Sequence, residues 1–313
     1  MKLIALLALT LVFSQAHSAG LELPDYTPTQ ITERIYVIHG PLEMPTPQNR
    51  GFMNNPVIAI SDSGVVIVDP GSSVFSGRMV LRQVKKLTDK PVTHVFGSHI
   101  HGDHWLGNHA IKDAYPEAQF YAHPVMIEMA KDGEANNWIE LMKSLTEGAT
   151  DGTRAVIPDN PLVDLQTFDL PGLPIRVHLT DQAHTKTDAM IEFVNESLVF
   201  LGDNALLGRI GRMNDGSFKG NVAALDRALT LETKWYVPGH GQTGGAEAAM
   251  LYRDYLDRIY QAAVKYSEEM MAPFEIKEVI EGDFSDYANW SGFEDEFGRQ
   301  ISLAVLEAEQ DAF

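Results

Sequence analysis

The feature that most constrains this chain is the segment 99–104, which reads His-Ile-His-Gly-Asp-His and holds four candidate metal ligands within six residues. The preceding segment 92–96 is rich in β-branched and aromatic residues, which predicts a buried strand that ends at Gly97. Loops at the C-terminal ends of strands commonly carry the chemistry of α/β proteins. The sequence therefore predicts a metal-binding loop at a strand end.

The spacing within this loop indicates two ions. In extended backbone His99 and His101 point the same way, so both can bind one ion at about 2.0–2.1 Å. Asp103 and His104 follow Gly102, where the chain can turn freely, and they suit a second ion nearby. Two ions about 3.5–4 Å apart form a two-metal hydrolytic site.

Three further candidate ligands follow predicted strands. His184 comes after a strand predicted at 175–179, Asp203 ends one predicted at 198–202, and His240 follows one at 234–237. We expect the first ion to be held by His99, His101 and His184, the second by Asp103, His104 and His240, and Asp203 to bridge both. A bridging water or hydroxide would occupy the remaining position, as in catalytic zinc sites. The histidines without partners in this pattern are expected to be structural: His39, His94, His109, His123 and His178.

Together with Asp69, at the end of a hairpin predicted over 57–68, this ligand set resembles the metallo-β-lactamase superfamily over about residues 31–245. The resemblance implies an αββα four-layer sandwich with the metals at one edge between two sheets. It also implies that Asp69 holds the ligand loop by hydrogen bonds rather than binding metal. The loop after His184 departs from the pattern, since relatives usually carry Gly where Thr187 stands. With an aspartate at 203 as the bridging residue, the site resembles that of lactonases and related hydrolases. The whole chain is similar to periplasmic hydrolases linked to quinoprotein and sulfur-oxidation systems.

Residues 1–18 predict a secretory signal peptide, since Lys2 precedes an apolar run at 3–13 and a small-x-small site at 16–18. We expect residues 19–313 to form one domain, with a core at about 31–245 and a C-terminal helical extension at 246–313. The protein is then periplasmic or secreted. With no cysteine, a lipid anchor and disulfides are excluded. A net charge of −19 argues against nucleic acid and anionic membranes as partners, which leaves a small-molecule substrate and an undetermined oligomeric state.

These residues predict a zinc-dependent hydrolase with two Zn2+ per chain. A metal-bound hydroxide would attack the carbonyl of an ester, thioester, lactone or β-lactam, and Asp103 would orient it and move a proton. The loop 41–53 and Trp105 are expected to form an apolar wall for the substrate. Candidate contacts for a substrate carboxylate are Arg209, Arg212 and Lys219. The alternative is an iron-containing sulfur or persulfide oxidoreductase on the same fold, because nitrogen and oxygen ligands suit iron or manganese as well as zinc.

Overall fold

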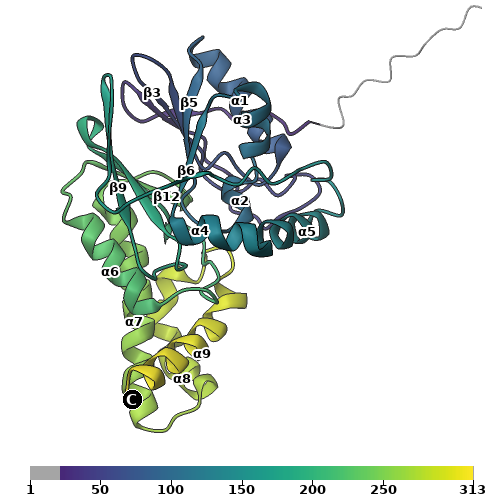
Figure 1. Cartoon of the computed structure of the whole chain (residues 1–313). Coiled ribbons are helices and arrows are strands. Elements are labelled where there is room, and N and C mark those ends of the chain that lie inside the picture. The colour runs from purple at the N-terminus through teal and green to yellow at the C-terminus, as the bar shows by residue number, and fades with distance from the viewer. Residues whose placement is uncertain (1–21, 313) are drawn as a thin grey trace, which may run out of the picture.

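The apolar runs of the sequence form two β-sheets in the computed structural model, which describes residues 22–312 (Figure 1). The first sheet has seven strands in chain order: β1 (Thr29–Gln30), β2 (Ile35–Val37), β3 (Val57–Ile60), β4 (Val65–Val68), β5 (Val92–Phe96), β6 (Gln119–Ala122) and β7 (Asn160–Pro161). Its strands are antiparallel from β1 to β4 and parallel from β4 to β7. The predicted hairpin over 57–68 and the predicted strand 92–96 are confirmed.

The second sheet has five strands in the order β12 (Trp235–His240), β11 (Leu198–Leu206), β10 (Ala189–Phe193), β9 (Leu173–Leu179) and β8 (Thr167–Leu170). The pair β11 and β12 is parallel, and the other neighbours are antiparallel. The sequence did not predict β8, because its residues alternate between half-buried and exposed and only pairing with β9 fixes them as a strand.

The two sheets pack face to face over a shared apolar core. Val66 and Phe96 of the first sheet belong to the same buried cluster as Val177 and Phe200 of the second. All four residues of β4 are buried, as expected for strands covered on both faces. Helices α1 (Val74–Leu87) and α3 (Asn108–Ala114) cover the outer side of the first sheet, and α6 (Phe218–Leu229) and α7 (Ala246–Glu268) that of the second. These four layers confirm the predicted αββα sandwich.

The segment 124–145 has a helical pattern of apolar residues but forms two helices, α4 (Pro124–Met129) and α5 (Ala135–Leu145). Between them lies a π-helical segment (Ala130–Glu134), in which Gly133 has φ of +123°. Only glycine adopts this conformation readily. The break directs α5 across the short helix α2 (Gly102–Trp105), where a Cβ on Gly102 would lie 2.8 Å from that of Trp138.

The C-terminal part is helical, with α7 followed by α8 (Pro273–Ile280), a 3-10 segment (Glu281–Tyr287) and α9 (Phe293–Asp311) (Figure 1). The rings of Phe284 and Phe297 lie tilted to each other with centroids 4.9 Å apart, which joins the 3-10 segment to α9. The Tyr255 hydroxyl of α7 donates to Gln300 of α9, so α9 also packs on α7. Within residues 22–312 the structure has no helix of sufficient length and apolarity to span a membrane. The predicted signal peptide lies outside the described residues.

A glycine pair tests how α1 packs beside the metal-binding loop. A Cβ on Gly77 of α1 would lie 2.3 Å from the Gly107 carbonyl oxygen, whereas one on Gly298 of α9 would meet only Lys277 Cδ at 3.5 Å. We expect Gly77→Ala to lower the free energy of unfolding by about 1–3 kcal/mol through overpacking. Gly298→Ala should raise it by up to about 1 kcal/mol through helix propensity. Urea unfolding measures both, and a stabilising Gly77→Ala would contradict this packing.

Candidate metal centre

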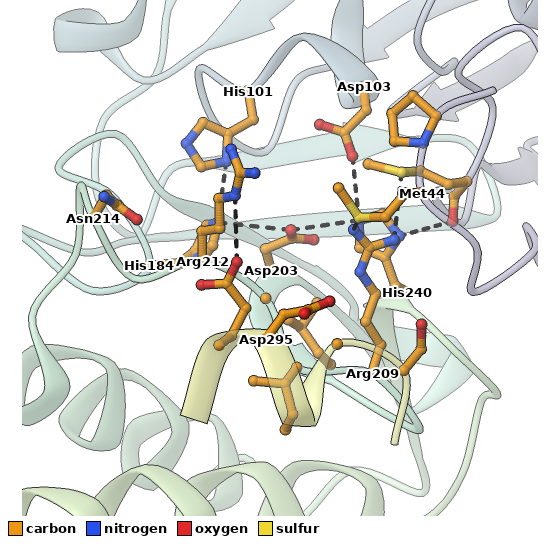
Figure 2. Close-up of a pocket in the computed structure, with 18 of the residues that line it drawn as sticks. Met44, His101, Asp103, His184, Asp203, Arg209, Arg212, Asn214, His240 and Asp295 are labelled. Atoms are coloured by element: carbon orange, nitrogen blue, oxygen red, sulfur yellow. Dashed lines mark hydrogen bonds and ion pairs between the residues drawn. The ribbon is translucent and has the colours of Figure 1, made fainter. Parts of the chain in front are cut away.

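The seven predicted ligands converge in two groups at one edge of the sandwich. The first group is His99, His101, His184 and Asp203, and the second is Asp103, His104 and His240. Within each group the donor atoms lie within 4.8 Å of one another. Asp203 joins the groups, because its Oδ1 lies 3.1 Å from His104 Nε2 and its Oδ2 lies 3.4 Å from His240 Nε2 and 3.6 Å from His184 Nε2 (Figure 2).

Strand ends and a short helix position these side chains. His99 follows β5, His101 caps α2, and Asp103 and His104 lie within α2. The predicted loop is therefore partly helical, since the turn after Gly102 closes into one helical turn. The strand predicted to end at residue 202 continues to Leu206, so Asp203 lies inside β11, where the register shifts beside Gly202 at φ of +56°.

Close backbone contact between β11 and β12 sets the position of Asp203. His240 is the last residue of β12, and its neighbour Gly239 lies against β11. A Cβ on Gly239 would be only 2.0 Å from Asp203 Oδ1. Glycine at this position therefore lets the shared carboxylate occupy the space between the two groups.

Four of the histidines are oriented by the ring nitrogen that faces away from the centre. His104 Nδ1 lies 2.7 Å from Asp69 Oδ2 and His240 Nδ1 lies 2.7 Å from the Met53 carbonyl oxygen. The other two such contacts are His99 Nδ1 to Ser98 Oγ at 2.9 Å and His101 Nε2 to Asp215 Oδ2 at 3.2 Å. Outer hydrogen bonds of this kind fix the tautomer and direct the free nitrogen toward a metal.

Asp69 is the central outer partner. Its Oδ1 accepts from the Ser98 backbone N–H at 2.7 Å, and its Oδ2 accepts from the Ser98 hydroxyl at 2.6 Å as well as from His104. The side chain is fully buried and belongs to neither ligand group. It therefore fixes the ligand loop by hydrogen bonds, as the resemblance implied.

Thr187, the departure from the family pattern, has a structural role. Its hydroxyl accepts from the Ile100 backbone N–H at 3.0 Å, so it joins the His184 loop to the His99 loop. Thr185 in turn donates from its backbone N–H and its hydroxyl to Asp188, both at 2.8 Å. Burial raises the pKa of Asp188 to about 7 despite these bonds. A glycine at 187 would lack the hydroxyl that connects the two loops.

The electrostatics of the centre favour cation binding. Burial lowers the pKa of His184 to about 3 and that of His99 well below its usual range, so both rings are neutral. Burial opposes ionisation of Asp203, but His240 and His104 hold the pKa of its carboxyl well below the ordinary value. Burial also opposes protonation of His104, yet Asp203 and Asp103 raise the pKa of its ring. The carboxylates thus attract positive charge to the place that a metal ion would occupy, and metal ligands bind in their deprotonated forms.

A buried ring nitrogen provides a second test of fit. His99 Nε2 is buried and forms no hydrogen bond or ion pair within the described residues. A buried polar atom without a partner costs about 1–3 kcal/mol, and His99 belongs to the first ligand group. The donor set therefore fits two divalent cations, with nitrogen and oxygen ligands suited to zinc, iron or manganese.

A cavity of about 750 Å3 opens above the ligands. Met44, Pro45 and Met53 line it, in agreement with the expected role of the loop 41–53. Trp105 does not line it, because its ring is fully buried and its Nε1 donates to the Ile100 carbonyl. Trp138 of α5 lines the cavity instead, although its place among apolar residues at helical spacing favours a core position. No signal in the sequence distinguished the two tryptophans, because the break at Gly133 decides where α5 lies.

Charged residues line the rest of the cavity, namely Arg209, Arg212, Asp215, Asp295, Glu296 and Arg299. Lys219 is not among them, since it pairs with Asp311 at 2.7 Å. The C-terminal extension supplies part of this wall. The Ser291 carbonyl accepts from the Ile210 N–H, and the Ser291 N–H donates to the Gly208 carbonyl. Together with a bond from Gln300 to the Gly211 carbonyl, they fasten the extension to the segment that carries Arg209 and Arg212. This contribution was missed, since long-range packing alone brings the two segments together.

The chain belongs to the metallo-beta-lactamase superfamily, whose family model it matches over residues 50–240. This confirms the predicted family and enzyme class. The chain is 22% identical over 257 residues to a linear primary-alkylsulfatase from a Pseudomonas species, covering 69% of this chain but only 48% of that relative. The chain thus spans about half the length of this curated relative.

Solved structures show the same fold. A metallo-beta-lactamase from Pontibacter korlensis superimposes with a TM-score of 0.59 at 17% identity, covering 74% of this chain and 98% of that one. The mono-zinc form of the metallo-beta-lactamase FIM-1 from Pseudomonas aeruginosa gives a TM-score of 0.58 at 18% identity, covering 77% and 98%.

Replacing Asp69 tests the outer hydrogen bonds. We expect Asp69→Asn to weaken metal binding about 10- to 100-fold, because an amide offers one acceptor oxygen where the carboxylate serves three donors. Competition with a chromogenic chelator measures this affinity. Asp113→Asn is the matched control, since Asp113 contacts His109 and Arg154 outside the cavity. Equal metal affinities of the two variants would contradict the role of Asp69.

Proposed function

We propose that the protein is a secreted, dinuclear zinc-dependent hydrolase that cleaves an ester, thioester, lactone or β-lactam. One observation carries the proposal: two groups of buried donors share Asp203 at the base of a cavity of about 750 Å3. Structural zinc sites are closed by four protein ligands, whereas catalytic sites keep a position open to substrate. The cavity provides that access, since His101, Asp103, His184, Asp203 and His240 all line it.

Two bound cations would supply Lewis acidity and a water with a lowered pKa, and the chain's own side chains perform the remaining tasks. Asp103 Oδ2 lies 3.3 Å from His240 Nε2 and 3.4 Å from His104 Nε2. Its carboxylate faces the cavity beside the shared Asp203 (Figure 2). From this position it can accept a proton from a water, orient that water toward a carbonyl carbon, and return the proton to the leaving group.

Arg209 is positioned to bind an anionic group of the substrate. Its guanidinium contacts Met53 Sδ at 3.3 Å, Met44 Sδ at 3.2 Å and the Glu43 carbonyl oxygen at 3.4 Å. Among residues 22–312 it has no carboxylate within ion-pair distance, although it is 8% exposed and lines the cavity. An unpaired guanidinium in this setting suits a carboxylate or sulfate. The name of the alkylsulfatase relative adds alkyl sulfates to the substrates that merit testing.

Secretion is part of the proposal and follows from the sequence. The apolar run at 3–13 with its small-x-small site supports export, and a chain without cysteine carries no thiol that an oxidising compartment could modify. The substrate is then a small molecule met outside the cytoplasm.

Metal removal tests the hydrolase proposal. We expect two divalent ions per chain by elemental analysis, and about one in His184→Ala and in His240→Ala, since each removes a ligand of a different ion. His94→Gln should retain two, because His94 lies outside both groups. Dialysis against EDTA should lower the hydrolysis rate about a hundredfold or more, with recovery on adding Zn2+.

The substrates for this assay are a chromogenic β-lactam, p-nitrophenyl butanoate, γ-butyrolactone, a thioester and octyl sulfate. Fewer than one ion per chain, or hydrolysis unaffected by EDTA, would refute a dinuclear metal mechanism.

A further inference from the structure

The helix α5 supplies an apolar wall to the cavity, and the hydrolytic chemistry does not use this wall. Trp138, Leu141, Met142 and Leu145 of α5 all line it. They are spaced at i, i+3, i+4 and i+7, so they form a single stripe along one side of the helix. We call these four residues the α5 stripe. Met142 is 2% exposed and belongs to a buried cluster against which Trp138 packs. Leu141 is 39% and Leu145 is 40% exposed, although an apolar stripe normally packs against a protein core.

The α5 stripe begins at the metal centre. The Trp138 ring lies 4.9 Å from the ring of His101, a ligand of the first group. The seven helical steps from Trp138 to Leu145 span about 10 Å at the rise of an α-helix. An apolar surface of this length therefore leads away from the ligands along the cavity wall.

The loop 41–53 adds further apolar side chains to the cavity lining. Figure 2 places Met44 beside Arg209 and His240, with His101 on the opposite side. Met44 is 50% exposed, and Met53 and Pro45 lie with it in the lining. Unbranched thioether side chains adjust their shape to flexible apolar ligands. The cavity thus combines a polar base with apolar surfaces that can follow a chain of variable conformation.

Isolated exposed leucines are common on protein surfaces. The α5 stripe differs because its members are in helical phase, line one cavity and start at the metal ligands. Concave apolar surface next to a few convergent polar groups is typical of a small-molecule site. Leu306 of α9, 53% exposed but absent from the cavity lining, represents the ordinary case.

We infer that the substrate carries an extended alkyl or acyl chain, which lies along the α5 stripe while the bond to be cleaved lies at the metal centre. This inference rests on the proposed hydrolase function and names its substrate class, an amphiphile with a polar scissile group and an apolar tail. Hydrolysis of such an ester consumes one water and releases a carboxylic acid and an alcohol. The helix α5 then selects the length of the substrate's tail, and the metal ligands determine which bond is cleaved.

Binding of two carboxylates of different length tests the tail site independently of turnover. We expect calorimetry on the metal-loaded protein to give a Kd for octanoate at least about tenfold lower than for butanoate, since each buried methylene contributes about fourfold. The double variant Leu141→Asn/Leu145→Asn should reduce this ratio to about threefold or less. Leu306→Asn is the matched control and should keep the wild-type ratio.

Rates with p-nitrophenyl octanoate and p-nitrophenyl butanoate separate the inference from the proposed function. If the protein binds octanoate more tightly than butanoate but hydrolyses neither ester, the tail site is supported and the hydrolase proposal is overturned for esters. Hydrolysis with equal kcat/KM for both esters, together with equal binding, would overturn the tail site and leave the hydrolase proposal intact. A length preference that persists in the double variant, with unchanged unfolding midpoints, would also overturn the tail site.

Discussion

The structure depends on a buried carboxylate, Asp203, that lies between two groups of imidazoles. Burying a charge is costly unless it is paired, and the Asp203 carboxylate lies 3.1 to 3.6 Å from the Nε2 atoms of His104, His240 and His184. The fold tolerates this because the surrounding elements are rigid: β11 and β12 pack so closely at Gly239 that the carboxylate has little room to move. The same closeness brings His240 to within 3.4 Å of Asp203 Oδ2.

Around this centre, four of the histidines are held by partners outside the two groups. Asp69 contacts His104, Ser98 contacts His99, the Met53 carbonyl contacts His240, and Asp215 contacts His101. These partners come from separate parts of the chain, so the centre requires both sheets to be in place. Conversely, loss of any outer bond would leave a buried imidazole free to rotate, which would weaken metal binding before it affected the fold.

The cavity shows how one family fold acquires a particular substrate range. The family model ends at residue 240, yet α9, further along the chain, contributes charged side chains to the lining. The α5 stripe comes from a segment that α4 and the break at Gly133 place over α2. The candidate ligands therefore lie at the strand ends and in α2, while parts of the cavity wall come from a broken helix and a C-terminal extension.

The sequence by itself predicted the sandwich and the seven side chains that converge at its edge, because short-range spacing and strand-end position are local properties. The segment 99–104, His184, Asp203 and His240 could be assigned in this way. Only the tertiary structure decided the walls of the cavity. In the structure Trp105 is buried, whereas Trp138 lines the cavity. Lys219 pairs with Asp311 outside the cavity, and the strand continues through Asp203. Those outcomes depend on helix breaks and on contacts between residues far apart in the chain, which residue type and spacing do not encode.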